Sequence, residues 1–425
     1  MSKNRVVIVG MGFAGVNAAL GLAGSECDVT LIDRNNYHLF QPLLYQVATA
    51  GLEQESIAYP IRALTRRWPN LDFRMAEVSG IDTIGRVLET TAGTIPYDYL
   101  VLAGGSETNF FGNAGVASHA HDLKRLPDAE TLRNKILNIF ECAVQETDPQ
   151  RRAEMLHFVV VGGGPTGVEF AGALIELIRY VLHKDYPHIS LDECKVVLIE
   201  AAPSILTALP KRLQEYAITR LESMGVEVRC NTLVADATDT SVILGTGEVI
   251  AARTLFWSAG VKANPLAGSL PGDTGPSGRV MVTDYLTLPQ DERVAVIGDM
   301  GCPPSSSGGP LPMMAPVAMQ QGRYIAKMLL NRIRGATLHP FRYVDKGSMA
   351  TIGRKSAVAA AFGLSFSGFA AWLVWLVLHL YYLIGFRNRI VVLLNWAWYY
   401  WFHERQVRLI TDPYNMPKTG SDGRD

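Results

Sequence analysis

The chain of 425 residues has almost no net charge, because 39 Lys and Arg residues stand against 40 Asp and Glu residues. A chain so close to neutral has no basic field for a phosphate backbone, which argues against nucleic-acid binding. Charged residues are also scarce, at 19% of the chain against the usual ~25%, while 48% of residues are hydrophobic. We therefore expect some apolar surface to contact a membrane or a partner. The length predicts two or three domains of roughly 100–200 residues.

Cysteine is rare, and the five cysteines stand far apart with no C-x2-C or C-x4-C pair. Their spacing argues against a disulfide framework, a zinc ribbon and a dithiol redox centre. No other side chains indicate a metal cluster or a nucleophile–base pair for hydrolysis. Residues 1–5 are polar and a strand-like run follows at once, which differs from the pattern of a signal peptide. We therefore expect a cytosolic chain with reduced thiols.

The first informative motif begins where a β-branched run, residues 6–9, ends in G-x-G-x-x-G at Gly10, Gly12 and Gly15. A helical stretch follows, and the next predicted strand ends in Asp33. In such a βαβ unit the glycines allow a tight turn, the approach of a pyrophosphate and close helix–strand packing. The helix N-terminus stabilises phosphate charge, and the acid can accept hydrogen bonds from ribose hydroxyls. A lone glycine motif is weak evidence, but with these neighbours it predicts a dinucleotide site.

The same pattern recurs later in the chain. The predicted strand 156–161 leads into Gly162, Gly164 and Gly167, a long helix follows, and the next strand ends in Glu200. The acid lies farther from the glycines than the usual ~20 residues, because a polar insertion precedes its strand. An acid suits a free 2′-hydroxyl and not a 2′-phosphate, which favours NAD over NADP.

Two further strand-to-glycine junctions, at residues 97–105 and 254–260, resemble each other, so the chain contains two copies of one dinucleotide-binding unit. A later predicted strand, residues 293–297, is followed by Gly298 and Asp299. Taken alone, this last junction is equally a simple turn from a strand into a loop.

The two glycine motifs and the late Gly-Asp resemble the flavoproteins with two dinucleotide-binding domains. In that family the first motif binds the ADP half of FAD, an inserted domain binds NAD(P)H, and the late Asp binds the ribityl chain. The resemblance implies non-covalent FAD bound by Gly10, Gly12, Gly15, Asp33 and Asp299, and NADH bound by Gly162, Gly164, Gly167 and Glu200.

Four segments narrow this resemblance to the type II NADH:quinone oxidoreductases: residues 40–51 (FQPLLYQVATAG), 162–169 (GGGPTGVE), 345–354 (DKGSMATIGR) and 383–389 (LIGFRNR). Members of that family pass two electrons from NADH through FAD to a membrane quinone, ubiquinone or menaquinone, without pumping protons. The likeness extends over nearly the whole chain. In the family's quinone motif, A-Q-x-A-x-Q, Pro316 replaces the first Gln here and Gln320 remains, which supports a quinone site near this helix start.

Several side chains near these motifs have two interpretations. Glu169, which we expect in the first turn of its helix, either complements the helix dipole or lies between nicotinamide and flavin, as the resemblance favours. Lys346 is either a solvated turn residue or a cation beside the flavin on its quinone side. Thr49 and Gln46 either line the flavin or form a structural turn. His379 is expected to be packed rather than to donate a proton.

The C-terminal part contains an uncharged segment, 366–386, that is long enough to span a bilayer. A shorter segment, 390–402, ends in a cluster of aromatic residues beside cations, which suits a headgroup interface. The first segment is a spanning helix, a buried helix or a helix lying in the interface. Because the family attaches in the last way, we favour peripheral, monotopic attachment at the cytoplasmic side of the cell membrane. A homodimer is compatible with the sequence.

We predict an α/β fold with two Rossmann-like domains: an FAD domain at 1–115 and 278–353, an inserted NADH domain at 116–277, and membrane-docking helices at 354–425. A sulfide:quinone oxidoreductase shares the fold but needs two redox cysteines, of which only Cys302 has a suitable position. A soluble NADH oxidase or peroxidase needs a reactive cysteine around residues 40–42. A flavoprotein that senses NADH without turnover is the alternative from another class.

Overall fold

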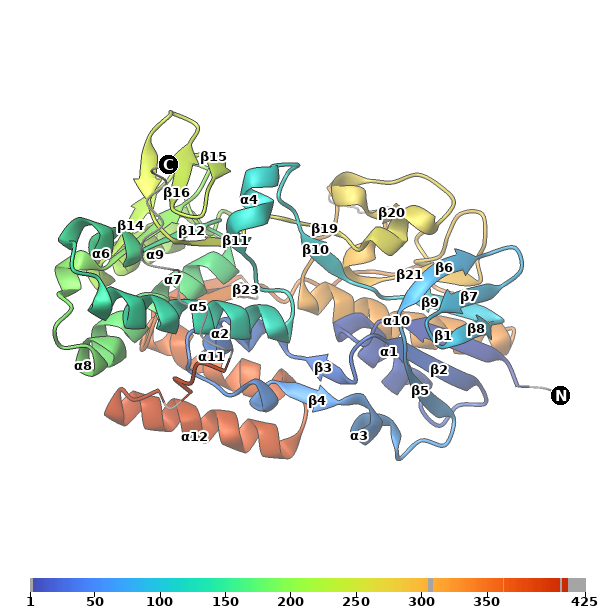
Figure 1. Ribbon diagram of the computed structural model, residues 1–425. Coiled ribbons are helices and arrows are strands. Elements are labelled where there is room, and N and C mark those ends of the chain that lie inside the picture. Colours follow the sequence, from blue (N-terminus) through green and yellow to red (C-terminus); the bar gives the residue numbers. More distant parts are fainter. Residues whose placement is uncertain (1–2, 305–308, 362, 406, 412–425) are drawn as a thin grey trace. The chain divides into compact units, whose positions relative to one another are not determined.

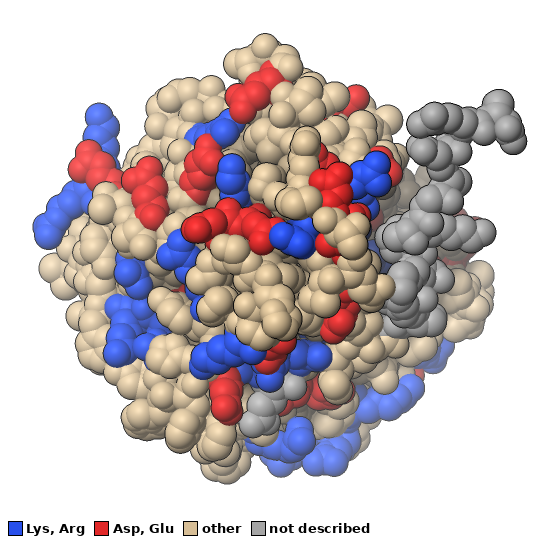
Figure 2. All heavy atoms as spheres, turned by 60° about the vertical axis from the view of Figure 1, so that its left-hand side comes forward, with Lys and Arg blue, Asp and Glu red and all other residues tan. Residues whose placement is uncertain are grey.

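The computed structural model describes residues 3–304, 309–361, 363–405 and 407–411, which form two compact units (Figure 1). Unit 1 comprises Met1–Leu39, Ala58–Thr108 and Val261–Lys346; unit 2 comprises Phe40–Ile57, Asn109–Gly260 and Gly347–Asp425. Lys and Arg side chains alternate with Asp and Glu side chains over the face in Figure 2, as the balanced composition implies.

Unit 1 is built on a five-stranded parallel sheet with β1 (Arg5–Val9) at its centre. The strand order is β21 (Val294–Val296), β9 (Tyr99–Leu102), β1, β2 (Asp28–Asp33) and β5 (Leu71–Met75). Four of the five β1 side chains are buried, which is typical of a strand covered on both faces.

Two helices of unit 1 pack closely against each other, α1 (Phe13–Leu22) and α10 (Ala315–Ile333). Gly322 makes this contact feasible, because a Cβ there would collide with the carbonyl oxygen of Ala14. The smaller elements of the unit are β3 (Tyr37–Leu39), β4 (Ala58–Pro60), α3 (Ile61–Thr65), β6 (Val78–Asp82), β7 (Val87–Thr90), β8 (Gly93–Pro96), β10 (Ser106–Thr108), β19 (Val261–Ala263), β20 (Val280–Met281) and β22 (Gly301–Cys302).

Unit 2 repeats the parallel sheet. Its order is β11 (Ala120–His121), β18 (Thr254–Trp257), β12 (His157–Val161), β13 (Lys195–Ile199) and β14 (Val226–Arg229). As β1 pairs with β2 and β9 in unit 1, β12 pairs with β13 and β18 here. The two Rossmann-like sheets predicted from the glycine motifs are therefore confirmed.

Unit 2 also contains further helices and smaller sheets. They are α2 (Leu44–Ala48), α4 (Ala114–His119), α5 (Leu126–Gln145), α6 (Pro149–Met155), α7 (Pro165–Leu177), α8 (His183–Asp185), α9 (Lys211–Met224), β15 (Val234–Ala237), β16 (Ser241–Leu244), β17 (Val249–Ala251), β23 (Ser348–Thr351), β24 (Ala357–Ala361) and β25 (Leu364–Gly368).

The C-terminal part of unit 2 forms two helices, α11 (Phe369–Tyr382) and α12 (Phe386–Phe402). Gly385, at φ +94°, forms the break between them. The uncharged segment is therefore not one long helix, because its first residues belong to β25 and α11 ends at Tyr382. Among the described residues, no helix has both the length and the apolar character needed to cross a bilayer. Both helices belong to unit 2, and the predicted borders of the FAD and NADH domains stay a prediction.

Candidate functional site

The first glycine loop has the shape of a phosphate cradle. Gly10 has φ +92° and lies so close to the Ala103 carbonyl that a side chain would collide with it. Gly12 is the N-cap of α1, and a Cβ built on it would meet no atom within 4 Å. No side chain caps this helix, so its first N–H groups are left for a ligand. The loop thus fits the pyrophosphate of a dinucleotide such as FAD.

The acid at the end of β2 closes the first loop. Asp33 accepts hydrogen bonds from the backbone N–H of Met11, at 2.6 Å, and of Asn35, at 2.7 Å. Burial raises the pKa of its carboxyl, while these hydrogen bonds act in the opposite direction. A carboxylate has about four acceptor positions, so Asp33 keeps capacity for ribose hydroxyls.

The second loop has the same construction. Gly162 has φ +107° and approaches the Ala259 backbone, while Gly164 is the uncapped N-cap of α7 with open space beside it. Glu200 accepts from the N–H of Gly163, at 2.5 Å, and of Ala202, at 2.7 Å. Each acid thus accepts one hydrogen bond from the N–H that follows the first glycine of its own loop, and a second from the N–H two residues after the acid. The second loop therefore fits a second dinucleotide.

Asp299 lies three residues after the end of β21, at the carboxyl end of the unit 1 sheet, where ligands of such sheets bind. Its Oδ2 accepts a hydrogen bond of 2.6 Å from Ser106. The backbone N–H of Gly298 donates to Oε1 of the fully buried Gln321, at 2.6 Å, which fixes the loop. The structure therefore holds Asp299 in place at the sheet edge that carries the first glycine loop.

A pocket of unit 2 contains two of the predicted side chains, Glu169 and Thr49. Its cavity volume is about 70 Å³, which is below the roughly 300–1,000 Å³ of a usual ligand site. Side chains from α2, α7, α11, α12 and the segments beside them line it, including Tyr45, Gln46, Thr49, Glu169, Glu176, Thr351, Trp375, Trp396, Tyr399 and Arg405.

Glu169 is buried and is the fifth residue of α7, so the expected position in the first turn is wrong. Its Oε1 accepts two hydrogen bonds, from the Thr351 backbone N–H at 3.1 Å and from Trp375 Nε1 at 3.2 Å. Burial raises the pKa of this carboxyl to about 8, and the two hydrogen bonds partly oppose that rise. Glu169 is therefore largely protonated at neutral pH, which a helix-dipole role does not explain.

The α2 side of the pocket is a hydrogen-bonded wall. Thr49 is buried, and its hydroxyl donates to the Tyr45 carbonyl at 2.9 Å, which closes the end of α2. Gln46 donates to the Tyr45 hydroxyl at 3.0 Å and accepts from Trp396 Nε1 at 2.7 Å. The aromatic part of α12 therefore helps to build the pocket.

Sequence reasoning missed a charged cluster in the same pocket. Glu176 accepts from the Arg354 backbone N–H at 2.5 Å and from the Tyr399 hydroxyl at 3.0 Å, and Arg405 lies 3.7 Å from it. Arg405 also donates to the Thr49 carbonyl at 2.6 Å. The only local signal was that Glu176 follows Glu169 by seven residues, two turns along one helix face.

Gln320 and Lys346, predicted near the quinone, lie in unit 1. The Gln320 amide exchanges two hydrogen bonds with the Val344 backbone, at 2.9 and 3.0 Å, and Lys346 is exposed. Pro316 lies in the first turn of α10, where a missing N–H costs no helical hydrogen bond. His379 is packed as expected, with its ring stacked on Trp375.

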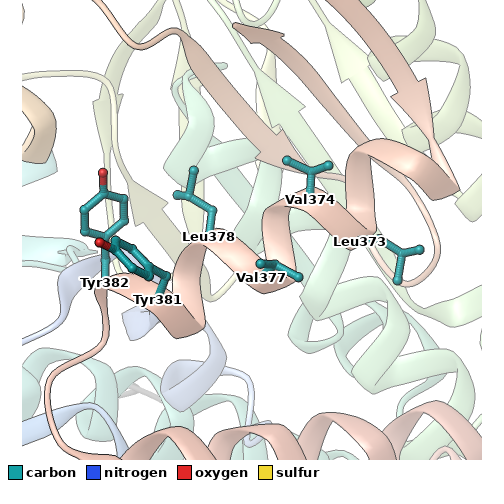
Figure 3. Close-up of a pocket in the computed structure, with 6 residues that line it drawn as sticks. All are labelled: Leu373, Val374, Val377, Leu378, Tyr381 and Tyr382. Carbon is teal, nitrogen blue, oxygen red and sulfur yellow. The ribbon is translucent and has the colours of Figure 1, made fainter.

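The outer side of α11 and α12 is apolar and exposed. Figure 3 shows Leu373, Val374, Val377, Leu378, Tyr381 and Tyr382 along α11, where they line a shallow hollow. Val377 is 68% exposed and Tyr381 71% exposed. On α12 the exposed apolar residues are Phe386, Ile390, Leu393, Leu394, Trp398, Trp401 and Phe402. We call this surface, on both helices, the docking face.

Comparisons with known proteins agree with this geometry. The family model of the pyridine nucleotide-disulphide oxidoreductases matches residues 4–322. A type II NADH:quinone oxidoreductase of Mycobacterium tuberculosis is 40% identical over 98% of this chain and 92% of its own length. The internal alternative NAD(P)H-ubiquinone oxidoreductase A1 of Arabidopsis thaliana mitochondria is 33% identical over 93% of this chain and 83% of its own.

Solved structures show the same fold at lower identity. NDH2 from Plasmodium falciparum, in complex with NADH, is similar with a TM-score of 0.89 at 20% identity, over 96% of this chain and 100% of that one. The sulfide:quinone oxidoreductase of Aquifex aeolicus is similar with a TM-score of 0.71 at 19% identity, over 92% of each chain.

Proposed function

Since the chain belongs to the type II NADH:quinone oxidoreductases and so transfers two electrons from NADH to a quinone with FAD as cofactor, we propose that the quinone is reduced at the unit 2 pocket that contains Glu169. One observation carries this proposal: a buried carboxyl with a pKa of about 8 lines a pocket to which both docking-face helices, α11 and α12, contribute side chains. A quinone with a long isoprenoid tail dissolves in the bilayer, so its site has to open towards lipid.

The reaction balances as NADH + H⁺ + quinone giving NAD⁺ + quinol. FAD, when bound, accepts the hydride of NADH and passes two electrons to the quinone. The protein has to bind and orient the substrates, exclude water and provide a proton at a quinone oxygen. Glu169 suits the last task, because a general acid is most effective when its pKa lies near the working pH.

The dinucleotides are assigned to the two glycine loops. Gly10, Gly12, Gly15, Asp33 and Asp299 bind FAD in unit 1. NADH binds in unit 2, at Gly162, Gly164, Gly167 and Glu200. The open helix N-termini and the two loop-closing acids support this assignment. Thr49 lines the quinone pocket and contacts the quinone. Gln320 and Lys346 belong to unit 1, and their roles stay predictions from the family resemblance.

The docking face attaches the protein to the membrane. Each large apolar side chain that leaves water contributes roughly 1.5–3 kcal/mol, so a few of the exposed residues of α11 and α12 suffice for firm binding. The aromatic residues near the end of α12 suit the headgroup region. Because NADH is a nucleotide of the cytoplasm, the docking face lies on the cytoplasmic side. A homodimer stays a prediction that a molar-mass measurement in detergent checks.

The sulfide:quinone oxidoreductase alternative needs a redox-active cysteine pair. The five cysteines of this chain are free thiols, and Cys302, the one closest in sequence to Asp299, is buried. Together with the complete second glycine loop, this favours NADH as the electron donor.

The test is rapid mixing of the purified full-length enzyme carrying Glu169→Gln, which keeps the size of the side chain and removes its proton. We expect flavin reduction by NADH at an unchanged rate and reoxidation by quinone at least about ten times slower below pH 8. Glu215→Gln, at an exposed position of α9, is the control and should match the unmodified enzyme. Unimpaired reoxidation of the Glu169→Gln enzyme at every pH would refute the proposed quinone site.

A further inference from the structure

The helix α11 has two different faces. Its exposed face is the apolar docking face, whereas its buried residues, Ala371, Trp375 and His379, are spaced four apart and form one stripe directed into unit 2. One helix thus contacts the membrane on one side and the interior of the pocket on the other.

The indole of Trp375 has a fixed orientation. The residue is 1% exposed, its ring stacks on His379 with centroids 3.9 Å apart, and the Trp396 ring lies 5.6 Å away. His379 is fixed in turn, because its Nδ1 hydrogen-bonds to the Trp375 carbonyl at 2.7 Å. The Trp375 N–H consequently points at Glu169 Oε1 and has little freedom to turn away.

The two oxygens of Glu169 have different environments. Oε1 accepts both hydrogen bonds, from Trp375 Nε1 and from the Thr351 N–H. An oxygen that accepts two N–H bonds has no free position for a proton, so the proton of the neutral acid resides on Oε2.

We propose that Trp375 is a positioning residue that, together with the Thr351 N–H, assigns the proton of Glu169 to Oε2 and so presents it to the quinone. The inference rests on the proposed function, because it assumes that Glu169 delivers a proton in this pocket. It adds that α11, a helix of the docking face, determines through Trp375 which oxygen of Glu169 carries the proton. The residues that bind the membrane and the residue that orients the acid then belong to one rigid element.

Two titratable groups packed around Glu169 have pKa values far from neutral pH. Tyr45 faces it from α2 with a pKa raised well above 10 by burial, and burial lowers the pKa of His379, behind Trp375, to about 4. Glu176, on the same helix, is held by the Tyr399 hydroxyl and the Arg405 guanidinium. Arg354 and Tyr400 complete the charged and phenolic groups that line the pocket. A shift of the midpoint in a Trp375 variant that the control variant lacks is therefore assigned to Glu169.

The test replaces the donor and keeps an aromatic ring, as Trp375→Phe in the FAD-loaded, full-length enzyme. An N–H donor stabilises the carboxylate, so its removal raises the pKa of Glu169. The rate of flavin reoxidation by quinone falls above that pKa, and we expect its midpoint to move up by about one pH unit. The plateau rate at low pH should fall at least about two-fold, because the proton is no longer confined to Oε2. Reduction by NADH should not change.

Trp257→Phe is the matched control, because it removes another buried indole donor of unit 2, one that donates to the Asn109 carbonyl at 2.9 Å and not to Glu169. It should leave the midpoint unchanged. If Trp375→Phe does not retain FAD, Trp375→His, which keeps a ring N–H, replaces it and should give a smaller shift. An unshifted midpoint and an unchanged plateau in the Trp375 variants, with Glu169→Gln still slow, would overturn the role of Trp375 alone. A Glu169→Gln enzyme with normal reoxidation would instead overturn the quinone site.

Discussion

The raised pKa of Glu169 makes the stability of the protein depend on pH in a predictable direction. The carboxyl has a pKa of about 8 in the folded protein and about 4.5 in an unfolded chain. Between these values the unfolded chain releases a proton that the folded protein keeps, so the free energy of unfolding falls as the pH rises. The full effect is about 5 kcal/mol, from a pKa difference of roughly 3.5 at 1.36 kcal/mol per unit.

Glu169→Gln removes this dependence. Between pH 5.5 and 7.5 the unmodified protein should lose roughly 2 to 3 kcal/mol relative to the variant, because the folded protein keeps most of the proton that the unfolded chain releases over that range. With an unfolding entropy of about 2.1 cal/mol/K per residue over 425 residues, this corresponds to a relative change of about 3 °C in Tm. The variant should therefore gain on the unmodified protein as the pH rises.

The measurement is differential scanning calorimetry of both FAD-loaded proteins at pH 5.5, 6.5 and 7.5. Other titrating groups cancel, because only the difference between the two proteins at each pH is used. Glu215→Gln, an exposed acid exchange, should show no trend with pH. A constant difference in Tm between Glu169→Gln and the unmodified protein would refute the burial argument, and with it the neutral acid on which the proposed chemistry depends.

Two further predictions concern the nucleotide and the membrane. Glu200→Gln keeps a hydrogen-bond acceptor for the second glycine loop and removes a charge that would repel a 2′-phosphate. In the unmodified enzyme we expect kcat/KM to be about 100-fold or more higher for NADH than for NADPH, and in the variant this ratio should fall at least about ten-fold. The same ratio in both enzymes would contradict the assignment. Val377→Glu combined with Leu394→Glu places two charges on the docking face. Co-sedimentation of this variant with vesicles should fall at least about ten-fold, while it still reduces a soluble quinone. The control variant Ile84→Glu, on an exposed hairpin of unit 1, should bind vesicles as the unmodified protein does.

The parts of the molecule that could be predicted from the sequence are those in which one short segment determines its own structure. Gly10 and Gly162 need a positive φ and a close backbone neighbour, and both requirements leave a local pattern of strand, glycines and helix. The acid at the end of the following strand completes that pattern. The helix break was also local: the sequence divided the tail into segments 366–386 and 390–402, and the structure begins α12 at Phe386, directly after Gly385.

The quinone pocket could not be predicted in the same way. Trp375 lies 206 residues from Glu169 along the chain, and Arg405 lies 356 residues from the Thr49 carbonyl to which it donates. No spacing rule connects such partners, because only the fold of unit 2 brings them together. The family resemblance indicated Glu169, and the sequence left Thr49 as either a flavin contact or a turn residue, but neither gave information on which side chains hold them.

The two dinucleotide sites could be predicted from local sequence and the quinone pocket could not, and this difference has a physical reason. A pyrophosphate carries charge, which a helix N-terminus can bind through backbone N–H groups, so two copies of one backbone motif suffice for two dinucleotides. A quinone is neutral and needs a dry pocket with a proton donor, and such a pocket has to be assembled from buried side chains of several elements. Burial in turn keeps Glu169 protonated, and the docking helices that provide the burial also provide the Trp375 N–H. Attachment to the membrane and proton delivery therefore depend on the same packing, and a substitution that loosens α11 should impair both.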